Sequence, residues 1–198
     1  MFFDILYADI TALQKTTIDS IINSAIQDSV FPGAVLCFGN SKDISFINSY
    51  GRYDYSPMSN PVNTYCIYDL ASLTKVIATT SSIMRLTERE MLNLNDPVCE
   101  HIPGFEINNK NQISIKNLLV HNSGLSPGRP LYSCCETKEI AIDSLFNLKP
   151  QYKTGEKTVY SDLGFIMLGL LVEKIAHQSL SAYVNQILNK EMQMKETT

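Results

Sequence analysis

Strand-like segments occur in this 198-residue chain only near its N-terminus, and this distribution limits the folds that are open to it. Ala34–Phe38 and Ile44–Asn48 are short β-prone runs, and Gly39–Asp43 between them is typical of a hairpin turn. A lone hairpin is only marginally stable in water, so helices or further strands must pack on it. We therefore expect an α+β protein with a helical part and an incomplete antiparallel sheet, represented by the N-terminal hairpin only.

Apolar residues recur at helical spacing in one segment before the hairpin and in five after it. The first predicted helix covers residues 18–26 and ends at Pro32-Gly33. The second runs from Ser72 to about Glu90. Its predicted buried residues are Val76, Ile77, Ile83 and Met84. The others cover residues 113–121, 139–148, 163–177 and 180–188, and the segments 92–98, 102–104 and 125–133 are predicted loops.

Composition is typical of a globular protein. The chain is 44% hydrophobic and 18% charged, and its length suits one domain, which we expect to cover residues 1–198. The net charge of −4 comes from scattered acids and bases, with no run of Lys or Arg that could neutralise phosphates. Nucleic acid is therefore not an expected partner.

Signals for export, membrane insertion and metal binding are not seen in the sequence. Residues 1–10 show no basic segment and no cleavage site, so we read no signal peptide and expect a cytoplasmic protein. The longest apolar run, Phe165–Val172, is far shorter than the roughly 18 residues of a membrane span. The five cysteines lack C-x-x-C spacing and the three histidines are dispersed, so neither a disulfide framework nor a zinc site is indicated. The adjacent Cys134 and Cys135 are read as reduced thiols in a loop.

Ser72-Leu-Thr-Lys75 has a hydroxyl and an amine three residues apart at the start of a predicted helix. Residues at i and i+3 lie on one helix face with Cβ atoms roughly 5–6 Å apart, so the amine can reach the hydroxyl. Serine becomes a good nucleophile when a base takes its proton, and the positive end of a helix favours the oxyanion. About one Ser-x-x-Lys is expected by chance in a chain of this length, so an ordinary helix face is the alternative.

Tyr160-Ser161-Asp162 precedes the apolar segment 163–177. A tyrosine is normally protonated at neutral pH, but a neighbouring lysine cation lowers its pKa and lets it carry a proton. An amphipathic tyrosine beside a Ser or Asp helix cap is the simpler explanation of the tripeptide by itself. The catalytic interpretation therefore depends on the other motifs that accompany the tripeptide along the chain.

Three motifs follow one another along the chain: Ser72-x-x-Lys75, then Leu118–Leu125, then Tyr160–Gly169. Their order resembles the serine beta-lactamase-related family, in the branch of class C beta-lactamases, D-alanyl-D-alanine carboxypeptidases and related esterases. Further matches lie at Phe31-Pro-Gly33, Pro57-Met58, Leu94–Val98 and Met192–Thr197. The resemblance covers nearly the whole chain and implies a beta-lactamase/transpeptidase-like fold, of which this chain would be the N-terminal part.

The resemblance implies roles for four residues. Ser72 would be acylated, Lys75 would be its base partner, and Tyr160 would move the proton to or from the leaving group. Asp162 stands where the family usually has Asn and would contact substrate, while its carboxylate would hold Lys75 protonated and weaken it as a base. This chemistry requires neither a metal nor an organic cofactor.

Two further segments complete the comparison with the family. His121 and Asn122 resemble its structural turn. Lys153-Thr154-Gly155 spells its third motif, which belongs on a late strand and supplies an oxyanion N–H, but here the tripeptide lies in a predicted loop and is read as a decoy. Members of the family continue well beyond the equivalent of Thr198, so we expect the chain to be truncated before the C-terminal strands.

The sequence thus supports two hypotheses. In the first, the chain belongs to a serine hydrolase that cleaves a small acyl compound or a short peptide, at an ester or amide bond, through an acyl-enzyme. In the second, it is a truncated or non-catalytic relative that at most binds a ligand. The open edge of an incomplete sheet would then favour self-association.

Overall fold

The structure of the chain is a computed structural model that describes residues 10–194 and 197. The chain divides into two compact units, Met1–Asp69 and Leu70–Thr198. The expectation of one domain over residues 1–198 stays a prediction. The reading of residues 1–10 as free of a signal peptide falls almost entirely on residues 1–9, which lie outside the described part.

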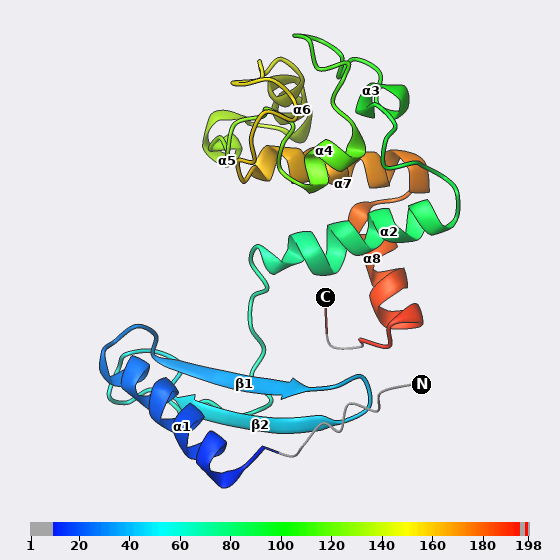
Figure 1. Ribbon diagram of the computed structural model, residues 1–198. Coiled ribbons are helices and arrows are strands. Elements are labelled where there is room, and N and C mark those ends of the chain that lie inside the picture. The colour runs from blue at the N-terminus through cyan, green and yellow to red at the C-terminus, as the bar shows by residue number, and fades with distance from the viewer. Residues whose placement is uncertain (1–9, 195–196, 198) are drawn as a thin grey trace. The chain divides into compact units, whose positions relative to one another are not determined.

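The first unit contains one helix and the predicted hairpin (Figure 1). Helix α1, Ala12–Gln27, begins with a capping box in which Thr11 and Gln14 bind each other's backbone N–H groups. Strands β1, Gly33–Gly39, and β2, Ile44–Gly51, pair antiparallel. The hairpin prediction is confirmed, and the described residues of this unit contain no third strand.

The junction between α1 and the hairpin is held by a partly buried polar contact and a tight turn. The Tyr50 hydroxyl donates a 2.6 Å hydrogen bond to the Asp19 carboxylate, which joins β2 to α1. Gly51 has a φ of 68°, and a Cβ there would lie 2.2 Å from the Pro32 carbonyl oxygen. Only glycine fits this position, because any side chain would collide with the backbone that enters β1.

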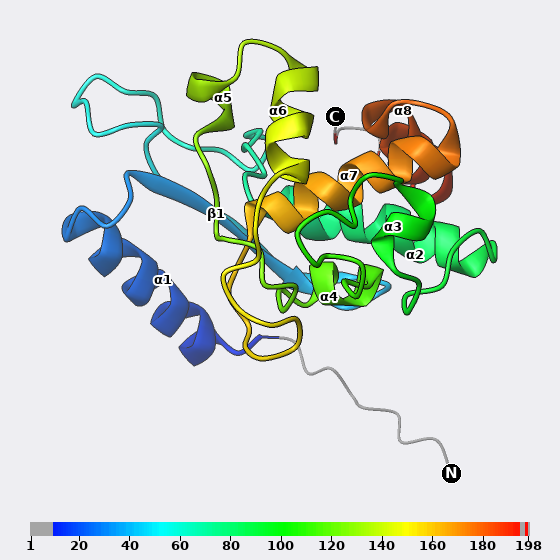
Figure 2. The ribbon, with the colours of Figure 1, turned by 90° about the horizontal axis from the view of Figure 1, so that it is seen from above.

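The second unit contains only helices as regular elements among its described residues. In chain order they are η1 Lys75–Thr80, α2 Ser81–Glu88, α3 Val98–His101, α4 Ile115–Leu119, α5 Leu131–Cys134, α6 Lys138–Phe146, α7 Asp162–Ala176, α8 Leu180–Asn185 and η2 Gln186–Glu191. The elements η1 and η2 are π-helical. Helix α7 contacts α2, α3, α4, α8 and η1 and forms the centre of the unit (Figures 1 and 2).

Helix α7 is the core helix because apolar residues occupy most of its circumference. Its buried residues are Leu163, Gly164, Phe165, Met167, Leu168, Gly169, Leu171 and Val172. The Ser161 hydroxyl caps its N-terminus by accepting a 3.2 Å hydrogen bond from the Gly164 N–H. Within the described part of the chain, no single helix is long and apolar enough to cross a bilayer, although α7 and the α8–η2 segment reach that length together across a 77° bend.

The helix predicted from Ser72 to Glu90 is present as η1 followed by α2, but two of its predicted core residues are wrong. Ile83 is only 1% exposed, whereas Val76 and Met84 are 62% and 65% exposed. A π-helical turn holds more residues than an α-helical turn, so η1 rotates Val76 away from the buried face of α2. Met84 follows Ile83 directly and therefore points about 100° away from it. The buried positions are Thr79, Ser82, Ile83 and Leu86.

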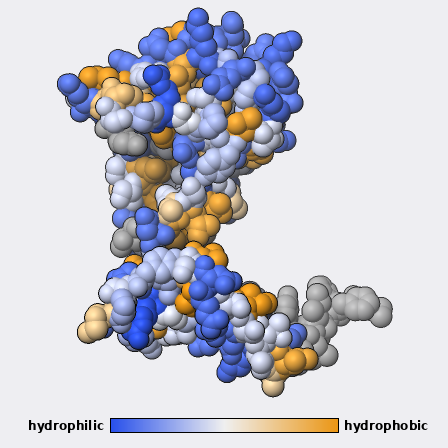
Figure 3. Space-filling view, turned by 90° about the vertical axis from the view of Figure 1, so that its left-hand side faces the viewer, coloured by the Kyte–Doolittle hydropathy of each residue, from blue (hydrophilic) through white to orange (hydrophobic). Residues whose placement is uncertain are grey.

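Figure 3 shows hydrophobic side chains gathered on the lower part of the second unit, below a mostly hydrophilic upper part. The exposed large hydrophobic residues of this unit include Leu73, Val76, Met84 and Ile166.

The predicted helices at 113–121, 139–148, 163–177 and 180–188 are confirmed as α4, α6, α7 and α8 with η2. Two single-turn helices, α3 and α5, were not predicted: α3 begins at the last residue of the predicted loop 92–98, and α5 begins inside the predicted loop 125–133. Pro97 and Pro130 stand directly before them. Proline disfavours helix in the residue before it but is well tolerated at a helix start, and the loop prediction at Pro97 used only the first half of that rule.

Lys110 is fully buried, which is unusual for a lysine. Its ammonium donates hydrogen bonds to the carbonyl oxygens of Ile107, Phe146 and Leu148 at 2.5, 2.7 and 2.9 Å. Three acceptors match the three donors of an ammonium group. Because the last carbonyls of a helix lack partners within it, Lys110 both satisfies the end of α6 and joins it to the preceding loop.

Candidate active site

Ser72 lies in the turn that leads into η1. The Lys75 backbone N–H donates a 3.1 Å hydrogen bond to the Ser72 carbonyl, and Ala71 adopts a left-handed φ of 44°. An alanine at positive φ is strained, and strain of this kind is concentrated at functional sites. The turn leaves the Ser72 side chain exposed at the start of the helix.

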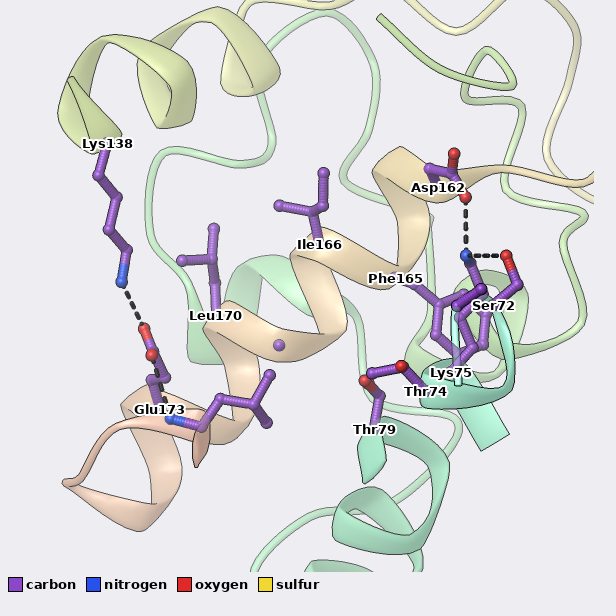
Figure 4. Close-up of a pocket in the computed structure, with 13 residues that line it drawn as sticks. Ser72, Thr74, Lys75, Thr79, Lys138, Asp162, Phe165, Ile166, Leu170 and Glu173 are labelled. Carbon is purple, nitrogen blue, oxygen red and sulfur yellow. Dashed lines mark hydrogen bonds and ion pairs between the residues drawn. The ribbon is translucent and has the colours of Figure 1, made fainter. Parts of the chain in front are cut away.

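The Lys75 ammonium contacts the other three residues that were selected from the sequence, and Figure 4 shows its contacts with Ser72 and Asp162. Its Nζ donates a 3.3 Å hydrogen bond to the Ser72 Oγ and lies 2.7 Å from the Asp162 Oδ1. The same nitrogen lies 4.9 Å from the centroid of the Tyr160 ring. The structure therefore brings a hydroxyl, an ammonium, a phenol and a carboxylate together, although the sequence separates the two pairs by more than eighty residues.

The N-terminus of α7 is fixed in place by the segment that follows α4. The Asp162 N–H donates a 2.7 Å hydrogen bond to the Pro127 carbonyl, and the Ser161 hydroxyl donates one of 2.7 Å to the Ser126 carbonyl. These bonds hold the first turn of α7, from which the Asp162 carboxylate reaches Lys75. Two segments far apart in sequence thus determine where the carboxylate lies.

His121 packs with its ring against the Tyr160 ring. Its ring lies 4.6 Å from the Tyr160 ring and 5.1 Å from the Phe165 ring, and its Nδ1 accepts a 3.0 Å hydrogen bond from the Ser161 N–H. Burial, and then the charge of Lys75, lower the pKa of His121, which agrees with a neutral ring whose Nδ1 accepts. The sequence analysis assigned His121 to a structural turn, and its contact with Tyr160 was not foreseen.

The cluster keeps a proton on Lys75. Burial by itself lowers the pKa of Lys75, but the Asp162 carboxylate and then Tyr160 outweigh it, and the net shift is upward. The Lys75 ammonium and then the Ser72 hydroxyl lower the pKa of Tyr160. Lys75 is therefore a cation at neutral pH, as expected from its contact with Asp162. Tyr160 loses its proton more easily than an ordinary tyrosine.

Lys153-Thr154-Gly155 lies in a loop and not on a strand. The Thr154 hydroxyl donates a 3.2 Å hydrogen bond to the Ser123 carbonyl, and the Gly155 N–H donates one of 2.8 Å to the Asn122 carbonyl. These contacts tie the loop to the turn after His121. Elsewhere in the described ranges, no group of three or more His, Cys, Asp or Glu side chains could hold a metal ion.

A groove of about 540 Å³ opens beside Ser72. Ser72, Lys75 and Asp162 line one end, and Lys138 and Glu173 line the other (Figure 4). Its remaining lining residues are Ala71, Thr74, Thr79, Phe165, Ile166, Gly169, Leu170 and Leu180. No sequence motif pointed to its far end, because Lys138 and Glu173 meet only when α6 packs beside α7.

The sequence model of the Beta-lactamase family matches residues 18–198. The chain is 32% identical over 186 residues to an N-acetylmuramyl-L-alanine amidase of Bacillus subtilis, a match that covers 84% of the chain and 42% of the relative. It is 30% identical over 190 residues to a putative D-alanyl-D-alanine carboxypeptidase of Escherichia coli K12, which covers 86% of the chain and 44% of the relative. The chain thus spans about two fifths of the length of these curated relatives.

Solved structures with the same fold include a class C beta-lactamase, with a TM-score of 0.78 and 24% identity over 91% of this chain and 49% of the other. EstCE1, a hydrolase with promiscuous acyltransferase activity, gives a TM-score of 0.77 and 22% identity over 90% of this chain and 51% of the other. These matches confirm the expected beta-lactamase/transpeptidase-like fold and the expected N-terminal coverage. The chain belongs to the beta-lactamase family.

Proposed function

We propose that the chain carries the acylation site of a serine hydrolase, with Ser72 as nucleophile. The observation that carries this proposal is the contact of one ammonium, Lys75, with the hydroxyl of Ser72, the carboxylate of Asp162 and the ring of Tyr160. An exposed serine beside a cation and a phenol of lowered pKa has the parts needed for attack on a carbonyl. An ordinary helix face offers no reason for these groups to converge.

The proton balance favours Tyr160 over Lys75 as the base. Lys75 holds its proton because Asp162 raises its pKa, so it has no lone pair to accept another. In its deprotonated form Tyr160 takes the Ser72 proton as Oγ bonds to the carbonyl carbon, and it then gives that proton to the leaving oxygen or nitrogen. Water later attacks the acyl-enzyme, loses its proton by the same route and regenerates Ser72.

The substrate proposed for this site is a small acyl compound or short peptide with a scissile ester or amide bond. Support for an amide comes from relatives named as an amidase and a carboxypeptidase. An ester is included because its carbonyl carbon is open to the same attack by a serine hydroxyl. The net charge of −4 gives no support to nucleic acid as a partner.

The test is the intact mass of the chain after exposure to a penicillin-type probe and, separately, to an activated ester. We expect a covalent adduct in the chain and in Ser81→Ala, a matched change at the start of α2 and outside the groove lining. We expect none in Ser72→Ala. An adduct of equal yield in Ser72→Ala, or no adduct from either reagent, would overturn the proposal.

A second candidate function is that of a non-catalytic relative that associates with itself. The observation that favours it is the two-stranded sheet of the first unit, since neither outer edge has a strand partner within the described ranges. Unpaired strand edges promote pairing between chains. Size-exclusion chromatography with light scattering should then give a dimer or larger species, and a clean monomer at high concentration would contradict this candidate.

A further inference from the structure

The groove beside Ser72 has walls that suit hydrocarbon better than peptide. Its floor is the side of α7 on which Phe165, Ile166 and Leu170 line it, and η1 forms another wall (Figure 4). The backbone N–H and C=O groups within a helix bond to each other. Helical walls therefore offer no row of backbone hydrogen-bond partners for an extended peptide. A peptide lying there would leave its own amides without partners, which is costly, whereas an alkyl chain has none to satisfy.

The far end of the groove presents a neutralised ion pair. The Lys138 Nζ lies 2.9 Å from the Glu173 Oε2, and the Glu173 Oε1 accepts a 3.1 Å hydrogen bond from the Leu180 N–H. The carboxylate thus has a partner on each oxygen, and the ammonium is already paired. A ligand with a charged terminus would have to compete with this pair, whereas an uncharged terminus would not.

The length of the floor indicates the length of the ligand. Phe165 and Glu173 are eight residues apart on α7, which corresponds to about 12 Å along the helix axis. An extended alkyl chain advances roughly 1.3 Å per carbon, given C–C bonds near 1.5 Å. The floor therefore matches a chain of about eight or nine carbons, and the groove volume lies within the usual range for small-molecule sites.

We propose that this groove receives the acyl part of the substrate and selects an uncharged, straight acyl chain of about eight carbons. The proposal rests on Ser72 being the acylated residue, because acylation then places the carbonyl at the polar end and the chain along α7. Ile166 and Leu170 set the preference for hydrocarbon, and the partly exposed Lys138–Glu173 pair marks the far end. The substrate class is thus a medium-chain acyl ester or amide.

The first test measures binding without catalysis. The Ser72→Ala chain is titrated with methyl acetate, butyrate, hexanoate and octanoate, and binding is followed by ligand-observed NMR. We expect affinity to rise about two- to fourfold per methylene up to octanoate, as burial of each methylene group predicts. Equal affinities across the series would overturn the groove assignment, whether or not the chain is catalytically active.

Variants then locate the effect. Leu170→Trp, and independently Ile166→Trp, should abolish the gain in affinity between butyrate and octanoate, because the indole fills the path of the chain. Ile140→Trp is the matched control: Ile140 is 47% exposed on α6 and does not line the groove, so the full gain should remain. Circular dichroism checks that each variant is folded. A gain that persists in both folded groove variants would overturn the proposal.

The second test separates this inference from the proposed function. Acylation of the unmodified chain by p-nitrophenyl acetate, butyrate and octanoate releases p-nitrophenol as the acyl–Oγ bond forms. A binding gain without any acylation would support the groove and count against Ser72 as a working nucleophile. Acylation at equal rates by all three esters, together with flat binding, would leave the proposed function standing and overturn the acyl-chain preference.

Discussion

Two lysine-centred regions of the second unit satisfy a sheltered ammonium in opposite ways. Lys75 contacts a serine hydroxyl, a carboxylate and a phenol, all of which can gain or lose a proton. Lys110 contacts three backbone carbonyls, which cannot. The difference teaches that burial of a lysine is not itself a sign of chemistry. The partners decide whether its charge organises proton transfer or merely closes a helix end.

The largest expected effect comes from Lys75→Met. Removal of the ammonium takes away the charge that lowers the pKa of Tyr160 and orients the Ser72 hydroxyl. We expect the rate of Ser72 acylation by an activated ester to fall by about 10²- to 10⁴-fold, the usual value for a lost acid–base group. The melting temperature should change little. A rate within threefold of the parent chain would refute the role of Lys75.

Lys110→Met should reduce the stability of the chain and leave its acylation rate unchanged, the reverse of the effect of Lys75→Met. It leaves three carbonyl oxygens around Lys110 without a donor, so we expect a loss of about 3 kcal/mol of stability and about 10 °C in melting temperature. Acylation per folded molecule should stay near that of the parent chain. Thermal unfolding followed by circular dichroism measures the stability, and single-turnover kinetics measure the acylation rate. Unchanged stability of Lys110→Met would contradict the structural role of Lys110.

Asp162→Asn tests how the Asp162 carboxylate affects the pKa values of Lys75 and Tyr160. The Asp162 carboxylate raises the pKa of Lys75 and, by its charge, opposes the lowering of the Tyr160 pKa. Its removal should lower the pKa of Tyr160 further, so the rise of the acylation rate with pH should begin at lower pH. We expect a gain of severalfold at neutral pH, measured as a pH profile. In Tyr160→Phe the acylation rate should no longer rise with pH. A rise that remains in this variant would show that a group other than Tyr160 is the base.

The smallest effect concerns His121. Its pKa in the folded chain lies below the unfolded value, so its contribution to stability is complete above the ordinary histidine pKa near 6.5 and is lost as pH falls through that value toward the folded pKa. Protonation of Nδ1 breaks the bond from the Ser161 N–H, worth about 1 kcal/mol. Melting temperatures between pH 8 and pH 5 should show this loss in the parent chain and a flatter response in His121→Leu. Parallel curves would rule out His121 as the source.

Much of the fold could be predicted from local sequence patterns, and the four candidate site residues were selected partly from such patterns and partly from the family resemblance. The hairpin, the apolar face of α1 and the four later helices follow from periodicity and turn residues. Ser72 and Lys75 share one turn, so their contact follows from helix geometry. The link from that turn to Tyr160 and Asp162 required the family resemblance, since no local rule joins residues so far apart.

The features that the sequence did not reveal depend on tertiary packing. The π-helical turn η1 changed which side of the Ser72 helix is buried, and nothing in the residues of that turn signals it. No sequence pattern singled out the buried Lys110, because its acceptors at the end of α6 come from another part of the chain. The Lys138–Glu173 pair likewise exists only where α6 meets α7.

The most direct test of the central claim is to locate the acyl group after brief exposure of the chain to p-nitrophenyl acetate, by tandem mass spectrometry of its peptides. The account predicts a single acetyl group on Ser72, formed quickly in the parent chain and slowly in Lys75→Met. Acetylation that falls on surface lysines while Ser72 stays unmodified would contradict it.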